Sequence, residues 1–464
     1  MGALPGAGIM IAIAIVYIVV TTGVGVWSIK YTKDTQSFMT AKNLMGPTII
    51  GILLMSEFIG TGSSLGTAQT AFEKGISAAW NVLTLGVGYL LYAFLMAPRF
   101  SALGEYTISG ALSRKYGTAT RLVVSVTMIY ALTTVNVSMY TGGAATIAVL
   151  LGVPATVGVL ICGAVAVLNV ATGGMRGVGY SNLIHVAFKY LGLIIIGVVA
   201  WGATGGPSNM AAKLPATYFA WDGVGVTTIA AWTIGNIGAV FSTQYVIQTI
   251  SGLDKPSDAR KAALIAAVAI VPFALLASFA GVGSKIMFPS IKSVNAIPQF
   301  LTIMDPYWGG LVVAALVAST FVTVLACQIG ATALFIKDFY TPLAKPGEAQ
   351  KLWASRVVSI VFGLLPIPFA LFMPGILSTI FFARALRTTV AVAAIAMFYL
   401  PHFSSGRGAA LGIALAAVGA SGWFFMNNPY GIDNIYVAVA IPAIVMVIDH
   451  LVSRARSNPV LGDA

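Results

Sequence analysis

The sequence predicts an all-α polytopic membrane protein with about 13 transmembrane helices. Hydrophobic residues make up 58% of the 464 residues, charged residues only 8%, and the mean hydropathy is +0.93. A soluble domain carries roughly 25% charged residues. The apolar residues also gather in runs of about the length that a helix needs to cross a bilayer, roughly 20 residues.

Thirteen such runs follow one another along the chain, with polar loops between them. The first is expected to be a retained span and not a cleaved signal, because the segment before it has no basic region. The predicted spans are 8–28, 45–73, 77–103, 119–150, 153–172, 179–204, 225–251, 262–287, 308–337, 353–373, 375–400, 408–427 and 433–453.

The basic residues predict the orientation, because Lys and Arg concentrate in cytoplasmic loops. With the N-terminus outside and the C-terminus in the cytoplasm of a cell membrane, four basic residues face outward: Lys74, Lys213, Lys285 and Lys292. Eighteen of the 25 face the cytoplasm: Lys30, Lys33, Lys42, Arg99, Arg114, Lys115, Arg121, Arg176, Lys255, Arg260, Lys261, Lys337, Lys345, Lys351, Arg356, Arg407, Arg454 and Arg456. This asymmetry accounts for the net charge of +12 without a nucleic-acid partner.

Several function classes lack their motifs. There is no GxxxxGK[ST] nucleotide-binding loop, which argues against an ATP-driven pump. No HExxH or CxxC pattern points to a metal enzyme, and the only histidines are His185, His402 and His450. Cys162 and Cys327 lie in apolar runs and suggest no disulfide. We expect neither an enzyme nor a bound cofactor.

The run 45–73 is too long for one straight span, and its centre, SEFIGTGSS, is rich in glycine and hydroxyl groups. Unwound backbone is tolerated at membrane depth only where it lines a cavity, and transporters bind ions and substrate at such breaks. The alternative is a small-residue packing face. That alternative explains the glycines but not Glu57, so we predict a broken helix.

The same region carries a family resemblance. Residues 44–80, LMGPTIIGILLMSEFIGTGSSLGTAQTAFEKGISAAW, resemble the first core helix of the sodium–solute symporter family, which includes proline, pantothenate and sugar symporters. Four further segments resemble family elements in the same order: TISGALSRKYG (107–117), GGMRGVGYSNLIH (173–185), DARK (258–261) and ATALFIKDFY (331–340). The resemblance covers residues 10–450.

This resemblance implies a five-plus-five inverted-repeat core with a leading extra helix. The implied organisation is a leading helix and cytoplasmic loop (1–44), the first repeat (45–204), an outer loop with the first helix of the second repeat and a cytoplasmic loop (205–261), the rest of that repeat (262–427), and a peripheral last helix with a cytoplasmic tail (428–464).

It also implies a sodium site between the broken helix and the eighth core helix. The family's carbonyl ligands fall on Ser56 and Ile59, and those of the eighth core helix fall on Ser319, Val322 and Thr323. An alternative register gives Thr320, Thr323 and Val324, and a third uses Ser319 and Thr320 with an insertion.

Several oxygen-bearing positions of the family pattern are changed. Val322 stands where a hydroxyl is expected, Asn182 where a carboxylate is usual, His185 where glutamine is usual, and Phe58 where the proline symporters have an aspartate. Sodium needs several oxygen ligands, so these losses bear on the coupling ion. Glu57 is either a replacement for the lost aspartate or faces elsewhere.

Lys189 lies about nine residues into its predicted span, roughly 13 Å along the helix axis and near the midplane. A charge at this depth is by default a functional hypothesis. Some transporters of related fold place a fixed cation where others bind sodium. Lys189 and Glu57 are therefore candidates for the coupling-ion site. Alternatives are a snorkelling lysine and a structural Lys189–Glu57 pair.

Arg384 and Arg387 share a face of the tenth core helix because they are three residues apart. Arginine binds carboxylates bidentately, so both are candidates for binding an anionic substrate, the alternative being lipid headgroups or carbonyls. The remaining substrate candidates are the residues of the break: Gly60, Thr61, Gly62, Ser63 and Ser64. His185 is a candidate proton relay or a structural, hydrogen-bonded histidine.

The sequence thus predicts a secondary transporter that moves a small hydrophilic organic solute by alternating access. A carboxylate is one candidate for this solute. Sodium is the coupling ion that the family implies. Proton-coupled or cation-independent transport, with Lys189 replacing sodium, is the alternative. A channel or a transport-inactive sensor is the alternative of another class.

Overall fold

The structure is a computed structural model that describes residues 4, 6–31, 34–40, 45–372, 375–403 and 405–457. Lys33 and Lys42, on which the predicted orientation partly depends, lie outside the described residues. Within these ranges the chain is helical and without strands, which confirms the predicted all-α membrane fold.

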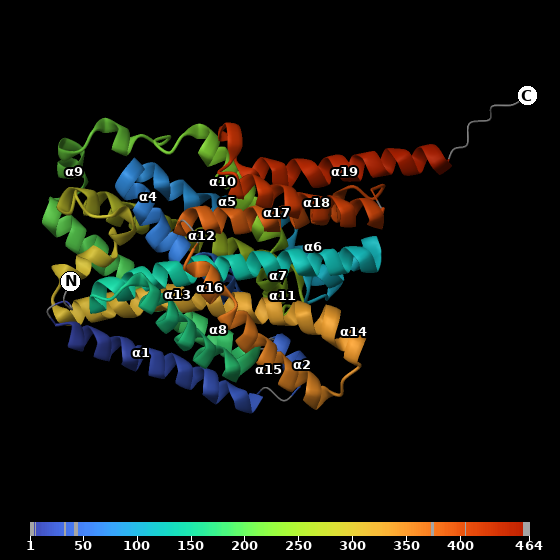
Figure 1. Cartoon of the computed structure of the whole chain (residues 1–464), viewed down its shortest axis with the longest axis horizontal. Coiled ribbons are helices and arrows are strands. Elements are labelled where there is room, and N and C mark those ends of the chain that lie inside the picture. Colours follow the sequence, from blue (N-terminus) through green and yellow to red (C-terminus); the bar gives the residue numbers. More distant parts are fainter. Residues whose placement is uncertain are drawn as a thin grey trace, which may run out of the picture.

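The long helices run roughly along the longest axis of the molecule (Figure 1). In chain order they are α1 (Ala7–Ser28), α3 (Pro47–Phe58), α4 (Thr67–Lys74), α5 (Trp80–Leu95), α7 (Ile108–Leu151), α8 (Ala155–Thr204), α10 (Val226–Ser242), α12 (Pro256–Met287), α13 (Pro306–Phe335), α15 (Glu348–Leu364), α17 (Ile376–Tyr399), α18 (Gly406–Phe425) and α19 (Asn434–Ser457). The short helices that matter below are α6 (Ala97–Leu103), α9 (Pro207–Lys213), α11 (Gln244–Ile250), α16 (Pro366–Ala370), η2 (Gly62–Gly66), η3 (Ile76–Ala79) and η7 (Ile336–Tyr340).

The predicted count of thirteen spans is not confirmed. The described residues form ten helices that are long and apolar enough to cross a membrane, or up to eleven with the bent pair. The predicted span 153–172 falls in the part of α8 before its interruption at Gly174, and the predicted span 225–251 corresponds to a shorter apolar helix, Val226–Ser242. The second of these is short because the backbone leaves the helix at Thr243 (φ −60°, ψ 128°) before α11 begins.

The predicted broken helix is confirmed. α3 ends at Phe58, the chain continues as a helix from Gly62 to Lys74, and the two halves are bent by 63°. Gly60 lies inside the break, where a β-carbon would come within 2.5 Å of the Thr323 hydroxyl and 2.6 Å of the Met139 sulfur. Only glycine lets the backbone approach α7 and α13 this closely.

Two further bends interrupt long helices at glycine. Gly117 (φ 79°, ψ −172°) interrupts α7, so the TISGALSRKY segment forms its own helical piece before the span. Gly174 (φ 57°, ψ −164°) interrupts α8 in the same way. Both backbone conformations are accessible essentially to glycine alone.

Burial distinguishes central helices from marginal ones. In the most apolar part of the span Pro306–Ala344, which contains α13, 89% of residues are buried, against 22% in Asn434–Arg454 and 28% in Ala7–Tyr31. α1 and α19 accordingly lie at opposite margins in Figure 1. α13 packs against α8, α7 and α1, while α17 packs against α7 and α10. The broken helix and α17 therefore meet in the middle of the protein.

Candidate functional site

A small cavity lies where the broken helix meets α17, α7 and α13. Its volume is about 20 Å³, which suffices for a single water molecule. The lining residues are Glu57, Phe58, Gly60, Gly62, Ser63, Val135, Met139, Thr323, Ile380, Arg384 and Arg387. A cavity of this size excludes an organic solute, so the structure is an occluded conformation around a candidate site.

Arg387 is paired with Glu57 inside this cavity. Its Nη2 atom lies 3.1 Å from Oε1 of Glu57, and the two side chains are 2% and 1% exposed. Its Nη1 atom donates a hydrogen bond of 2.9 Å to the hydroxyl of Thr243. Glu57 precedes the break after α3, and Thr243 lies at the break between α10 and α11. The guanidinium of Arg387 on α17 therefore contacts both interrupted helices. The Lys189–Glu57 pair left open by the sequence does not form in this structure.

Arg384, one turn earlier on α17, has no carboxylate within ion-pair distance among the residues that the structure describes. Its Nη1 atom donates to Oδ1 of Asn81 at 2.9 Å, and its guanidinium lies 4.5 Å from the ring centre of Phe381. Asn81 is held in turn, because its amide donates to the Thr67 hydroxyl at 2.7 Å and to the Gly62 carbonyl at 3.3 Å. Arg384 is thus a buried, oriented cation that lines the cavity without an anion.

Lys189 reaches the break from α8. Its ammonium donates to the backbone carbonyl of Ile59, and the side chain is 1% exposed. The ring of Phe273 lies 5.9 Å away, and in the described part of the chain no acidic side chain forms an ion pair with this lysine. Ile59 is the carbonyl on which the family resemblance places a sodium ligand, so the ammonium approaches the predicted cation position directly.

The neighbouring oxygen atoms already take part in protein hydrogen bonds. The hydroxyl of Thr323 donates to the Glu57 carbonyl at 2.8 Å. The amide of Asn182 donates to the Ser56 hydroxyl at 3.1 Å and to the Val322 carbonyl at 3.5 Å. The Val322 side chain offers no oxygen ligand. Of the predicted sodium ligands, the Ile59 carbonyl thus accepts from Lys189 and the Thr323 hydroxyl donates to Glu57, while Val322 lacks the expected hydroxyl.

Thr323 and Thr320 distinguish the alternative registers of the eighth core helix. Thr323 contacts the break, whereas Thr320 donates to Leu316 and packs toward Gly143 of α7. Ser319 lies one turn before Thr323 and therefore on the same helix face. This geometry favours the register that uses Ser319 and Thr323.

The hydroxyl groups of the break mostly satisfy its own backbone. Ser63 donates to the Phe58 carbonyl and Ser64 to the Gly60 carbonyl at 3.1 Å. Thr61 points instead to the sulfur of Met139, at 3.2 Å. Of the substrate candidates, Gly60, Gly62, Ser63 and both arginines line the cavity, while Thr61 and Ser64 do not in this conformation.

His185 lies on α8, one turn before Lys189. Its Nδ1 atom forms a hydrogen bond with the hydroxyl of Tyr17 on α1, and its ring is buried. This contact joins the leading helix to α8. The geometry favours the structural interpretation of His185 over the proton relay.

Two residues of the site were missed by the sequence reasoning, Asn81 and Thr243. The signal for Asn81 is an amide in an otherwise apolar span, directly after the GISAAW motif. Thr243 gives no comparable signal, because no glycine or proline marks that break.

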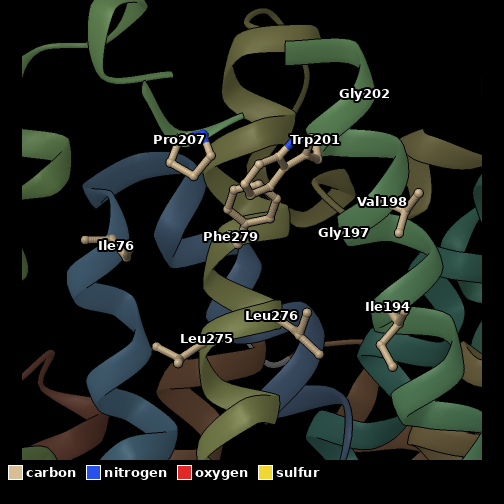
Figure 2. A pocket seen from close by; sticks show the side chains of 10 residues that line it. All are labelled: Ile76, Ile194, Gly197, Val198, Trp201, Gly202, Pro207, Leu275, Leu276 and Phe279. Atoms are coloured by element: carbon tan, nitrogen blue, oxygen red, sulfur yellow. The ribbon is translucent and has the colours of Figure 1, made fainter. Parts of the chain in front are cut away.

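Larger cavities lie elsewhere but suit no hydrophilic solute. A pocket of about 640 Å³ between α8, α12 and η3 is lined only by apolar residues and glycine. Figure 2 shows the rings of Trp201 and Phe279 close together on its wall, with Pro207 to their left and Ile194 and Val198 on the α8 side. A second pocket, of about 680 Å³, is lined mainly by aromatic and aliphatic side chains of α7, α15, α16 and η7. These are apolar spaces between membrane helices.

Charged groups join the start of α7 to η7, which follows α13. Lys337 lies 2.7 Å from Glu105, which also pairs with Arg114 at 2.8 Å. The buried carboxylate of Asp338 accepts hydrogen bonds from Ser109, at 2.5 Å, and from Ser125. Two of the family-like segments, 107–117 and 331–340, therefore meet here.

Known proteins match this chain over most of its length. A model of the sodium:solute symporter family matches residues 38–409. The chain is 23% identical over 393 residues to the uncharacterized symporter YwcA of Bacillus subtilis (strain 168), covering 79% of this chain and 75% of that protein. It is 23% identical over 446 residues to a sodium/glucose cotransporter of Vibrio parahaemolyticus, covering 86% and 82%. A solved Na⁺-coupled sialic acid symporter, substrate-bound and outward-open, superposes with a TM-score of 0.79 at 18% identity, covering 96% of this chain and 98% of that one.

Proposed function

This chain belongs to the sodium:solute symporter family, and from that premise we propose that it transports a small organic anion whose carboxylate binds Arg384. A secondary active, cation-coupled transporter of small solutes is what the family and the fold establish, and it is not an enzyme. The protein is a multi-pass membrane protein, and the family supports Na⁺ as its coupling ion.

The observation that carries the anionic substrate is the unpaired state of Arg384. A buried charge is normally paired, and an uncompensated one costs several kcal/mol. Asn81 supplies one acceptor and orients the guanidinium toward the cavity. A carboxylate would complete the pairing bidentately, which a neutral sugar or a cation does not do. Sialic acid, the substrate of the structurally similar symporter, also carries a carboxylate.

Transport requires the cavity to enlarge and to open alternately to each side. The occluded volume of about 20 Å³ accepts no solute. Opening toward the cytoplasm separates α7 from α13 and breaks the Glu105–Lys337 contact. The helix break supplies the movable halves around the substrate.

Coupling at the break runs through Lys189. Its contact with the Ile59 carbonyl supports an ammonium group in the place of a sodium ion, and the missing oxygen at Val322 supports it further. A desolvated lysine can release its proton, so this position would couple transport to protons. Sodium bound at Ser56, Ile59, Ser319 and Thr323 is the second candidate, which the family membership favours.

Uptake by purified protein in liposomes tests these assignments. Sodium and pH gradients are imposed separately, with labelled pyruvate, succinate, sialic acid, proline and glucose as solutes. We expect uptake of a carboxylate that responds to the pH gradient. Strict sodium dependence without any effect of pH would refute the role of Lys189, and uptake of glucose alone would refute the anionic substrate.

A Lys189→Ala variant sharpens the coupling test. We expect its uptake to lose the response to pH, whereas an unchanged pH profile would remove Lys189 from coupling. Steady single-channel currents in a planar bilayer would instead establish a channel, and binding of the carboxylate without any flux would establish a sensor.

A further inference from the structure

The ion pair between Glu57 and Arg387 is not used by the proposed transport step. Both side chains are nearly inaccessible, and they face the same 20 Å³ cavity as Arg384. Arg384 is free to receive a substrate carboxylate, whereas Arg387 already has one. In the empty protein Arg387 is therefore ion-paired and Arg384 is not, although the sequence places them on one helix face.

The Glu57–Arg387 ion pair lies where several helices meet. Glu57 is the penultimate residue of α3, Thr243 separates α10 from α11, and Arg387 contacts both from α17. Closing the empty cavity brings α3 and the break between α10 and α11 against Arg387 of α17. Burying the Arg387 guanidinium without a partner would cost free energy, and Glu57 is the anion that it meets there.

We infer that Glu57 is an internal counter-ion that lets the carrier close and reorient without substrate. The inference rests on the proposed transport of an anion. A loaded carrier brings a carboxylate into the cavity that Arg384 and Arg387 share. An empty carrier has only the carboxylate of Glu57 for this purpose among the described residues.

The Glu57–Arg387 pair would then determine whether the protein performs net transport or exchange. A carrier that returns empty performs net transport, whereas one that can reorient only when loaded performs exchange. With Glu57 neutralised, the loaded form still closes around the substrate anion and the empty form does not. The ratio of net flux to exchange should therefore be lower in Glu57→Gln than in the unaltered protein, because net flux falls more than exchange does.

Closure of the empty carrier can be measured without a substrate. The sulfur of Cys327 lies 4.0 Å from Nη2 of Arg387, so its rate of reaction with N-ethylmaleimide reports opening of the cavity once it is corrected for the thiolate fraction, which the pH profile of labelling gives for each variant. In proteoliposomes of a Cys162→Ala parent, we expect Glu57→Gln to raise the labelling rate at least tenfold, equivalent to about 1.4 kcal/mol. Labelling of Glu57→Gln at the parent rate would overturn the inference.

Two variants separate the charge effect from general loosening. Glu57→Asp keeps the carboxylate and should label as slowly as the parent. Glu57→Gln combined with Arg387→Gln removes both charges and should restore slow labelling, so rapid labelling of this double variant contradicts the counter-ion role. The double variant also carries the test if Glu57→Gln alone fails to fold.

The second cysteine of the chain provides a matched control. Cys162 is buried where α8 packs toward Gly143 of α7, away from the cavity. In a Cys327→Ala parent, its labelling should not change with Glu57→Gln. An equal increase at Cys162 would show loosening of the whole fold and would overturn the specific role of Glu57.

Flux measurements complete the test, with labelled pyruvate, succinate and sialic acid as probes. Glu57→Gln should lower the ratio of net flux to exchange at least tenfold, and the double variant should recover most of it. An unchanged ratio overturns the inference. Absence of transport of every probe by the unaltered protein would defeat the proposed function, while the labelling result still decides whether Glu57 controls closure.

Discussion

The buried cations Lys189, Arg384 and Arg387 surround one helix break, yet each has a different kind of partner. Arg387 has a carboxylate, Lys189 has a backbone carbonyl, and Arg384 has a neutral amide. A neutral partner compensates a guanidinium least, so Arg384 gains most from a bound anion.

Substitution of Arg384 tests this difference at the residue scale. Arg384→Gln should raise the KM for the transported carboxylate at least tenfold, because a charge-assisted hydrogen bond contributes about 1.5–3 kcal/mol. Arg407→Gln, at an exposed position, is the matched control and should leave KM unchanged. Equal KM values for Arg384→Gln and the unaltered protein would exclude contact with the substrate.

Sequence reasoning located the charged residues of the site but not their pairing. The depth of Lys189 and the presence of Glu57 at a break follow from hydropathy and composition. The partner of Glu57 depends on the direction in which its side chain leaves the last turn of α3, and the 63° bend sets that direction. The interruption at Thr243 was missed because a contact from Arg387, distant in sequence, stabilises it.

At the scale of the element, the break needs glycine for close approach and not only for flexibility. Gly60→Ala places a methyl group against Thr323 and Met139, and overpacking of this kind costs about 1–3 kcal/mol. We expect a lower melting temperature and slower transport. Gly23→Ala in α1 meets no neighbour within 4 Å and should not lower the melting temperature. A Gly60→Ala protein as stable and active as Gly23→Ala would contradict the close packing.

The contact between Glu105 and Lys337 of η7 should depend on pH. Partial desolvation acts to raise the pKa of Glu105, but hydrogen bonds and charges from Lys337 and Arg114 outweigh it, so the pKa lies below the ordinary value of 4.5. A carboxylate with a lowered folded-state pKa stabilises the fold at neutral pH, and this contribution is lost as the pH falls through the folded-state value. Melting temperatures of the unaltered protein and Glu105→Gln should therefore differ at pH 7 and converge below pH 4.5. A constant difference down to pH 3 would exclude this contribution.

At the scale of the whole molecule, α1 begins and α19 ends at opposite ends of the long axis (Figure 1). Together with the distribution of basic residues, this supports an outside N-terminus and a cytoplasmic C-terminus. A green fluorescent protein fused after the last residue should fluoresce, because it matures in the cytoplasm. A fusion that ends at Pro289, in a predicted outer loop, should remain dark, and the reverse pattern would invert the topology.

The ammonium of Lys189 also has an electrical consequence. A dissolved cation crosses the membrane with the anion and cancels its charge. A cation attached to the chain instead returns with the empty carrier. If Lys189 keeps its proton throughout, the anion moves alone and an inside-negative voltage expels it, by about 2.3 kcal/mol per 100 mV. If Lys189 releases its proton inward on every cycle, uptake becomes electroneutral. The sign of the voltage response in a patch-clamped vesicle thus reveals the fate of a single proton on one side chain.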